Sequence, residues 1–154
     1  MDEVTLRDVR DEDLPILFPF QVDPVATEMA AFPTREWEPF MAHWAKIRAD
    51  ETVSAKVIEF NGEIAGDVVS WLDSGHRNVG YWIGRKFWGR GIASKALAMF
   101  LAELEERPLY AHVALHNRGS LRVLEKCGFM VSKDDLGEAD ASGDDVEELL
   151  MKLD

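Results

Sequence analysis

A short basic and glycine-rich stretch, "YWIGRKFWGRGIASKAL" (residues 81–97), is the part of the sequence best suited to chemistry. It combines three glycines with four cations, which are Arg85, Lys86, Arg90 and Lys95. The free N–H groups at the start of a helix carry partial positive charge, and glycine lets an anion approach them closely. The stretch therefore suits a phosphate, and a diphosphate better. A tight strand-to-helix connection that is basic without binding anything is the alternative.

Two common phosphate-binding motifs do not match this stretch. The sequence "GRKFWGRG" has the glycine spacing of a P-loop, but Arg90 and Gly91 stand where the lysine and the serine or threonine are needed. The sequence "GRGIAS" lacks the third glycine of a dinucleotide fingerprint, and the following predicted strand offers no acid for a ribose hydroxyl. Magnesium-nucleotide and dinucleotide chemistry are therefore not favoured.

The pattern of apolar residues predicts the elements that must position this turn. Period-2 alternation and turn residues such as Asn61-Gly62 indicate strands, and apolar spacing of three to four indicates helices, one of them with Thr34 as its N-cap. The predicted strands are 3–9, 52–60, 63–72, 79–84, 107–115, 129–133 and 146–153, and the predicted helical regions are 11–32, 34–51, 91–106 and 117–127. We expect an α/β (α+β) fold with a mixed, mostly antiparallel sheet of about six to seven strands flanked by helices. A helical crossover makes the fourth and fifth strands parallel, and the polar segment 134–145 is expected to be a mobile hairpin loop.

Composition narrows the classes of protein that fit. The length of 154 residues suits a single domain spanning 1–154. A net charge of −12 argues against nucleic-acid binding, and no apolar run is long enough to span a membrane. The acidic start predicts no secretory signal, so we expect a cytoplasmic protein. The lone Cys127 gives no disulfide and no zinc site, and we expect it to be a buried apolar residue and the protein to need no metal.

Two segments resemble the GCN5-related N-acetyltransferases, and within them the RimJ/RimL-like branch. "GYWIGRKFWGRGIASKAL" is similar to the family's acetyl-CoA motif, with Trp88 in place of its first Gln/Arg, and "HNRGSLRVLEKCGF" is similar to its second motif. The resemblance implies that the fourth and fifth strands splay apart and that acetyl-CoA lies between them. It further implies cofactor contacts from the backbone of Tyr81, Trp82 and Ile83, from the turn residues Gly89, Arg90, Gly91, Ile92, Ala93 and Ser94, and from Asn117 and Ser120.

The resemblance also implies a reaction, the transfer of an acetyl group from acetyl-CoA to a primary amine. Many relatives carry a tyrosine in the second motif that protonates the leaving thiolate, but Leu124 stands at that position. The branch suggests Ser120 as the catalytic acid in its place. A backbone N–H near Ile83 is the candidate donor to the developing oxyanion. The residues themselves leave the base open, and the candidates are His112, His116, Glu28, Asp67, Ser70 and Asp73, or a chain of waters.

The acceptor amine and the assembly are the least defined features of the sequence. The aromatic and histidine side chains Trp37, Phe40, His43, Trp44 and Trp71 are candidates for lining the acceptor entrance, although helical spacing also suits a core. The acids Asp8, Asp11, Glu12, Asp13, Glu36 and Glu38 either attract a cationic amine or form a solvated surface. The acceptor can be a protein N-terminus or a small-molecule amine, and a homodimer is compatible with the sequence. The alternatives are a non-catalytic acyl-CoA-binding or regulatory domain of the same fold, and a binder of another phosphate ligand.

Overall fold

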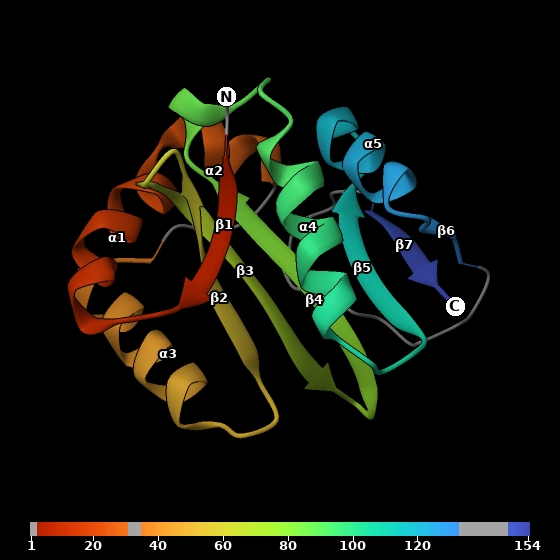
Figure 1. Ribbon diagram of the computed structural model, residues 1–154, viewed down its shortest axis with the longest axis horizontal. Helices are drawn as coiled ribbons and strands as arrows, with labels where there is room; N and C mark the ends of the chain where they lie inside the picture. The colour runs from red at the N-terminus through yellow and green to blue at the C-terminus, as the bar shows by residue number, and fades with distance from the viewer. Residues whose placement is uncertain (1–2, 31–34, 133–147) are drawn as a thin grey trace.

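The computed structural model describes residues 3–30, 35–132 and 148–154, which form one mixed sheet with helices on both faces (Figure 1). Within these residues the sheet has seven strands in the order β1-β2-β3-β4-β5-β7-β6. The strands are β1 (Val4–Asp8), β2 (Ser54–Phe60), β3 (Glu63–Asp73), β4 (His76–Ile83), β5 (Leu109–Ala114), β6 (Met130–Val131) and β7 (Glu148–Leu153). Only β4 and β5 pair in parallel. The predicted fold class and the parallel pair are confirmed.

The helices divide between the two faces of the sheet. They are α1 (Leu14–Val22), α2 (Pro24–Ala30), α3 (Trp37–Ala49), α4 (Ile92–Glu103) and α5 (Arg118–Lys126), with short 3-10 helices η1 (Asp11–Asp13) and η2 (Arg85–Phe87). A larger core joins the sheet to α4 and α5, and a smaller core joins it to α1 and α3. Figure 1 shows α4 crossing one face of the sheet while α1 and α3 lie beside β1 and β2. We call these the α4 face and the α1 face.

The sheet opens between β4 and β5. Their ladder contains two residue pairs, Arg77 with Leu109 and Asn78 with Tyr110, and both lie at the start of β5. Beyond them, residues 79–83 of β4 pair with β3 alone. Because strands that stop pairing diverge, the end of β4 faces a gap that leads to α4 and α5. The splayed pair that the family resemblance implied is therefore present.

Strand β4 begins earlier than the sequence suggested. The sequence predicted that this strand begins at residue 79, but the turn before it consists of Ser74 and Gly75, with φ angles of 53° and 80°. Two central residues with positive φ form a tight hairpin connection, so His76 already pairs with Asp73. The sequence therefore predicted too long a connection between β3 and β4.

Some expectations about the remaining segments are wrong or untested. The N-cap of α3 is Glu36, so the predicted cap at Thr34 is wrong in position, and Thr34 itself lies outside the described residues. The predicted loop 134–145 also lies outside them. In the described parts of the chain, none of the helices is both long and apolar enough to cross a bilayer. The same parts hold no cluster of three or more acidic, histidine or cysteine side chains arranged for a metal.

Candidate active site

The glycine turn leads into an uncapped helix. Gly89 and Gly91 have φ angles of 78° and 75°, in the region that favours glycine. A Cβ atom added at either position would meet nothing within 4 Å, so the turn is open on the side where those side chains would lie. Gly91 is the N-cap of α4 and provides no side-chain cap, which leaves the N–H groups of the first turn for another acceptor. These features fit a diphosphate held by backbone N–H groups.

The cations around this turn fall into two groups. Arg85 and Lys86 are engaged by acids, with Arg85 Nε 2.9 Å from an oxygen of Asp23 and Lys86 Nζ 2.8 Å from an oxygen of Glu63. Two further cations, Arg90 and Lys95, are exposed and have no acidic partner in the portion of the chain that the structure describes. The positive potential at the turn therefore comes from these two cations and from the helix itself.

Trp88 fixes the end of β4 against the glycine turn. Its indole N–H donates to the carbonyl oxygen of Ile83 at 2.9 Å, while 40% of the residue remains exposed. Of the three predicted cofactor-pairing residues, Ile83 therefore already uses its carbonyl, whereas Tyr81 and Trp82 lie in the part of β4 that pairs with β3 and not with β5. The substitution of Trp88 for the motif's Gln/Arg adds a strand-to-turn contact that an exposed tryptophan can make.

The second motif begins at α5, across the gap from β4. Asn117 is the N-cap of α5, and its side-chain oxygen accepts from the N–H of Ser120 at 3.2 Å. Asn117 therefore caps the helix, and its contact with a cofactor stays a prediction. The motif's Leu124 is 2% exposed and belongs to the core of the α4 face.

Sequence reasoning missed the side chain of Tyr81. Its hydroxyl and that of Ser120 share a hydrogen bond at 2.5 Å, which joins β4 to α5 across the gap. Burial raises the pKa of Tyr81 to about 12, against the opposing effect of the bond to Ser120. At neutral pH this pair therefore has protonated hydroxyls, and a proton taken from Ser120 can be replaced from Tyr81. The tyrosine at 81 was considered only for its backbone, since no spacing rule links it to Ser120.

Several of the candidate bases have partners or surroundings that do not favour a role as base. His116 donates from Nε2 to the backbone oxygen of Glu28 at 2.9 Å, and His112 lies 3.8 Å from Glu148 on β7. The hydroxyl of Ser70 is sealed inside the protein without a hydrogen-bond partner in the described residues. Asp73 is exposed at the turn that ends β3, where it accepts from Ser74.

Asp67 has a different environment from these candidates. It lies in the middle of β3, directly opposite Trp82 of β4, and it is half-buried. The described chain offers its carboxylate neither a hydrogen bond nor an ion pair. Burial alone raises the pKa of Asp67 from 3.8 to about 7. A carboxyl group that titrates near neutral pH can accept a proton from a cationic amine.

The predicted acceptor entrance is only partly supported. Phe40 and Trp44 are buried in the core of the α1 face, which is the core reading of their helical spacing. Trp37 is 42% exposed, and its ring packs against Phe18. On the same face, the half-buried His43 has a pKa lowered by burial, with smaller effects from the nearby cations.

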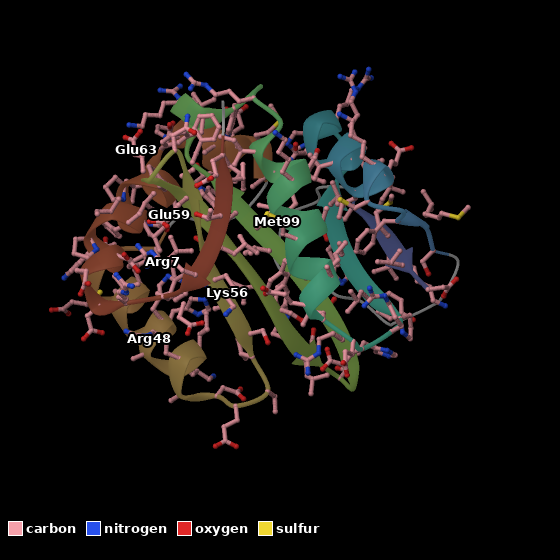
Figure 2. The ribbon with its side chains drawn as sticks, viewed as in Figure 1. Arg7, Arg48, Lys56, Glu59, Glu63 and Met99 are labelled. Atoms are coloured by element: carbon pink, nitrogen blue, oxygen red, sulfur yellow. The ribbon has the colours of Figure 1, made fainter. Side chains whose placement is uncertain are left out.

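Three of the six acidic residues singled out in the N-terminal region are paired with cations. Asp13 is buried and accepts two hydrogen bonds from Arg7 at 2.8 Å, and Asp8 lies 2.6 Å from Lys56. Asp11 is bonded to Arg48. Figure 2 shows Arg7, Lys56 and Arg48 on the side of the molecule formed by β1, β2 and α3. These three acids are therefore engaged by local cations, and the attraction of a cationic amine by the remaining acids stays a prediction.

Cys127 behaves as a half-buried apolar residue at the end of α5. Its sulfur lies 3.7 Å from the backbone oxygen of Ser94 in α4, and burial raises the pKa of its thiol. A thiol with a raised pKa is a poor nucleophile at neutral pH. The environment of Cys127 therefore supports a structural role for this residue.

Solved structures show where else this arrangement of strands and helices occurs. A spermidine N-acetyltransferase from Vibrio cholerae, in complex with CoA and spermine, superposes with a TM-score of 0.81 at 19% identity, over 97% of this chain and 94% of that one. An acetyltransferase of the GNAT family from Bacillus anthracis gives 0.80 at 16% identity, over 97% and 93%. An aminoglycoside acetyltransferase in complex with coenzyme A gives 0.78 at 19% identity, over 98% and 94%. At these identities the likeness establishes the fold alone.

Comparison with known sequences gives the family. No curated protein matches the chain. The sequence profile of the Acetyltransferase (GNAT) domain matches residues 3–130, which includes both the glycine turn and the helix with Ser120. The chain belongs to the GNAT acetyltransferase family.

Proposed function

We propose that this protein is an N-acetyltransferase that moves the acetyl group of acetyl-CoA to a primary amine by direct attack while both substrates are bound. One observation carries the proposal. The open glycine turn of α4 and the hydroxyl pair of Tyr81 and Ser120 lie at the same opening of the sheet, beside the unpaired end of β4. A diphosphate seat and a proton donor at one cleft are what acyl transfer from a CoA thioester requires.

The residues proposed to hold acetyl-CoA come from three elements. The N–H groups of the turn and the first turn of α4 bind the diphosphate, and the backbone of β4 pairs with the pantetheine arm. Asn117 adds a contact at the start of α5. The full set is Gly89, Arg90, Gly91, Ile92, Ala93 and Ser94 at the turn, Tyr81, Trp82 and Ile83 on β4, and Asn117 and Ser120 on α5. When bound, acetyl-CoA supplies an acyl group activated as a thioester.

Ser120 is the proposed acid for the leaving thiolate. Its hydroxyl lies one turn into α5 and is bonded to Tyr81, so a proton that it donates is replaced through the same hydrogen bond. Because the pKa of Tyr81 is about 12, its hydroxyl stays protonated at neutral pH and can pass a proton to Ser120. A backbone N–H near Ile83 donates to the oxygen of the thioester carbonyl as negative charge develops there.

The proposal defines the acceptor only as a primary amine, which is broader than its definition of the reaction. The RimJ/RimL-like motif pattern favours the N-terminal amine of a protein or peptide, while the spermidine and aminoglycoside acetyltransferases of the same fold act on small amines. We propose a primary amine in either case, one catalytic domain over 1–154, no metal and a cytoplasmic location. A homodimer is compatible with this proposal.

Thiol release tests the proposed activity. Purified protein with acetyl-CoA and a panel of spermidine, kanamycin and an unblocked peptide is expected to release free CoA in proportion to the acetylated amine. Calorimetry is expected to show acetyl-CoA binding that CoA competes away and that ATP and NAD do not. Absence of acetyl-CoA binding would overturn the assignment.

Single substitutions then test the acid. Ser120→Ala is expected to lower kcat ~100-fold with a change of less than about threefold in acetyl-CoA affinity. The matched control Ser54→Ala, at the start of β2, is expected to behave as wild type. Unchanged turnover in Ser120→Ala would remove Ser120 from the chemistry.

The presence of leucine at position 124 supports a second candidate function. Because the position where many relatives carry a tyrosine holds a buried leucine, the chain also fits a non-catalytic acyl-CoA-binding or regulatory domain. The same assay separates the two: tight acetyl-CoA binding without release of thiol by any amine indicates the binding domain.

A further inference from the structure

Asp67 faces the same side of the sheet as helix α1. Directly paired residues of neighbouring strands share a face, and Asp67 is paired with Val57 on one side and with Trp82 on the other. Val57 belongs to the core with Leu14 and Leu17 of α1, and Trp82 donates its indole N–H to the backbone oxygen of Phe20 at 3.0 Å. The carboxylate of Asp67 therefore lies beneath α1, between an aliphatic side chain and an indole ring.

The face of the sheet that carries Asp67 is opposite the face that carries the proposed proton donor, Ser120. Tyr81 precedes Trp82, so its side chain is on the α4 face, where it meets Ser120. Trp82 lies in the part of β4 that does not pair with β5. A reaction centre in the gap therefore has the hydroxyl pair on one side of the sheet and Asp67, one strand away, on the other.

Aromatic side chains lie near Asp67 on the same face of the sheet. The ring of Trp71 lies over Gly80, where an added Cβ would be only 3.2 Å from it. Gly80 is two residues from Trp82 and shares its face. A carboxylate beside indole rings suits the ammonium group of a primary amine, which combines charge with an attraction to aromatic faces.

The carboxylate is neither paired nor sealed. Ser70 and Asn78 have side-chain atoms that are closed off from solvent, whereas the oxygens of Asp67 are not among the sealed atoms. The cation in the same row of the sheet is Arg7 of β1, which is already bonded to Asp13 and Glu59. Asp67 is thus a half-buried carboxylate whose oxygens are not fully sealed and which no cation of the described residues neutralises.

We propose that Asp67 binds the acceptor ammonium group and takes one proton from it. This inference rests on the proposed N-acetyltransferase activity. The ammonium loses that proton to Asp67 and becomes a neutral amine, whose nitrogen forms a bond to the acetyl carbon while the C–S bond breaks. The nitrogen loses a second proton as the amide forms, the thiolate gains one from Ser120, and the second proton passes through solvent to restore the hydroxyl of Ser120. Asp67 later returns its own proton to solvent. The net products are the amide, CoA thiol and one proton.

The surroundings of Asp67 explain why its carboxyl group titrates near neutral pH, as a base for an amine requires. Helix α1, which packs on β3 and β4, has no titratable side chain. The charged or titratable groups on the other elements of this face are Arg7 and Asp13, Glu59 of β2, His76 of β4, Tyr110 and His112 of β5, Glu148 and Lys152 of β7, Glu28 of α2, Arg35, and Glu38, His43, Lys46 and Arg48 of α3. None of these contributes to the raised pKa of about 7, whose cause is burial. Activity that depends on ionised Asp67 therefore falls as the pH drops below about 7.

The experiment compares Asp67→Asn and Asp67→Glu with the control Asp154→Asn, which removes the same charge from the exposed end of the chain. The acceptor is whichever of spermidine, kanamycin and an unblocked peptide wild type acetylates fastest. For Asp67→Asn we expect kcat/KM at pH 7 to fall ~100-fold or more, with acetyl-CoA affinity within threefold of wild type. We expect Asp67→Glu to recover part of the rate and the control to match wild type. We also expect the acid limb near pH 7 to vanish in Asp67→Asn.

Three results would overturn the inference. They are an Asp67→Asn variant within about threefold of wild type, a variant that keeps the acid limb, and a variant whose rate falls only in parallel with acetyl-CoA binding. If Asp67→Asn does not fold, Asp67→Ala replaces it, and added formate is expected to restore part of its rate; failure of that rescue counts against the base. A wild-type protein that binds acetyl-CoA but acetylates no amine refutes the proposed function itself, and the role of Asp67 with it.

Discussion

The energetic cost of burying Asp67 can be measured without knowing the acceptor. In the folded protein the pKa of Asp67 rises from 3.8 to about 7 because burial disfavours the charged form. The folded state therefore holds this proton over a pH range in which the unfolded chain has lost it. By linkage, the contribution of Asp67 to the free energy of unfolding falls as the pH rises from about 4 to about 7.

The magnitude follows from the same two pKa values. The interval from 3.8 to about 7 corresponds to at most ~4 kcal/mol. Since the side chain retains some exposed surface, we expect ~2–4 kcal/mol. Asp67→Asn keeps the shape and removes the charge, so the variant should equal wild type near pH 3.5 and exceed it by ~2–4 kcal/mol at pH 8.

Urea unfolding of both proteins at several pH values provides the assay. Only the difference between the two free energies of unfolding is interpreted, because other titrating groups contribute equally to both proteins. A difference that is the same at low and high pH would show that Asp67 titrates alike in the folded and unfolded chains. That result would refute the assigned environment of the carboxylate.

Three other predictions test the turn, the helix cap and the buried ion pair. Gly91→Ala should lower the free energy of unfolding by ~1–2 kcal/mol and weaken acetyl-CoA binding, whereas Gly75→Ala, at an equally positive φ in the hairpin turn, should cost a similar amount and leave acetyl-CoA binding unchanged in calorimetry. Asn117→Ala should cost ~1 kcal/mol in thermal unfolding, and Asn117→Asp should recover most of it, because the cap needs only a side-chain oxygen. Asp13→Asn should cost ~2 kcal/mol at pH 7, since it removes one of the two carboxylates bonded to the half-buried Arg7 and leaves only Glu59. The pKa of Asp13 is lowered by its bond to Arg7, so this cost should shrink as the pH falls below about 4, as urea unfolding at pH 3 and pH 7 would show.

The fold could be predicted because its signals are local. Asn61-Gly62 fixed one hairpin, and the glycines at 89 and 91 marked the start of α4 with the positive φ angles that the structure shows. The order of strands and helices then left few topologies, and the single helical crossover implied one parallel pair. Residues near each other in the chain determine each of these features.

The candidate site was less accessible because it depends on contacts between distant residues. Tyr81 and Ser120 are separated by 39 positions, and their contact requires both the splay of the sheet and the position of α5. Asp67 appeared in the sequence as one of several acids, and only the register of three strands shows that its neighbours are Val57 and Trp82. The alternation of residues along the strand indicates which face of the sheet carries Asp67. A pKa near 7, however, depends on which residues cover that face.

The two-pair ladder between β4 and β5 has a mechanical consequence. Strands β1 to β4 form one hydrogen-bonded block and β5 to β7 another, and the blocks are joined at one end of their common border. Amide hydrogen exchange should therefore divide the sheet into two cooperative units that open separately. A ligand that occupies the border would bond to both blocks, and its arrival should be visible as slower exchange in strands it never touches.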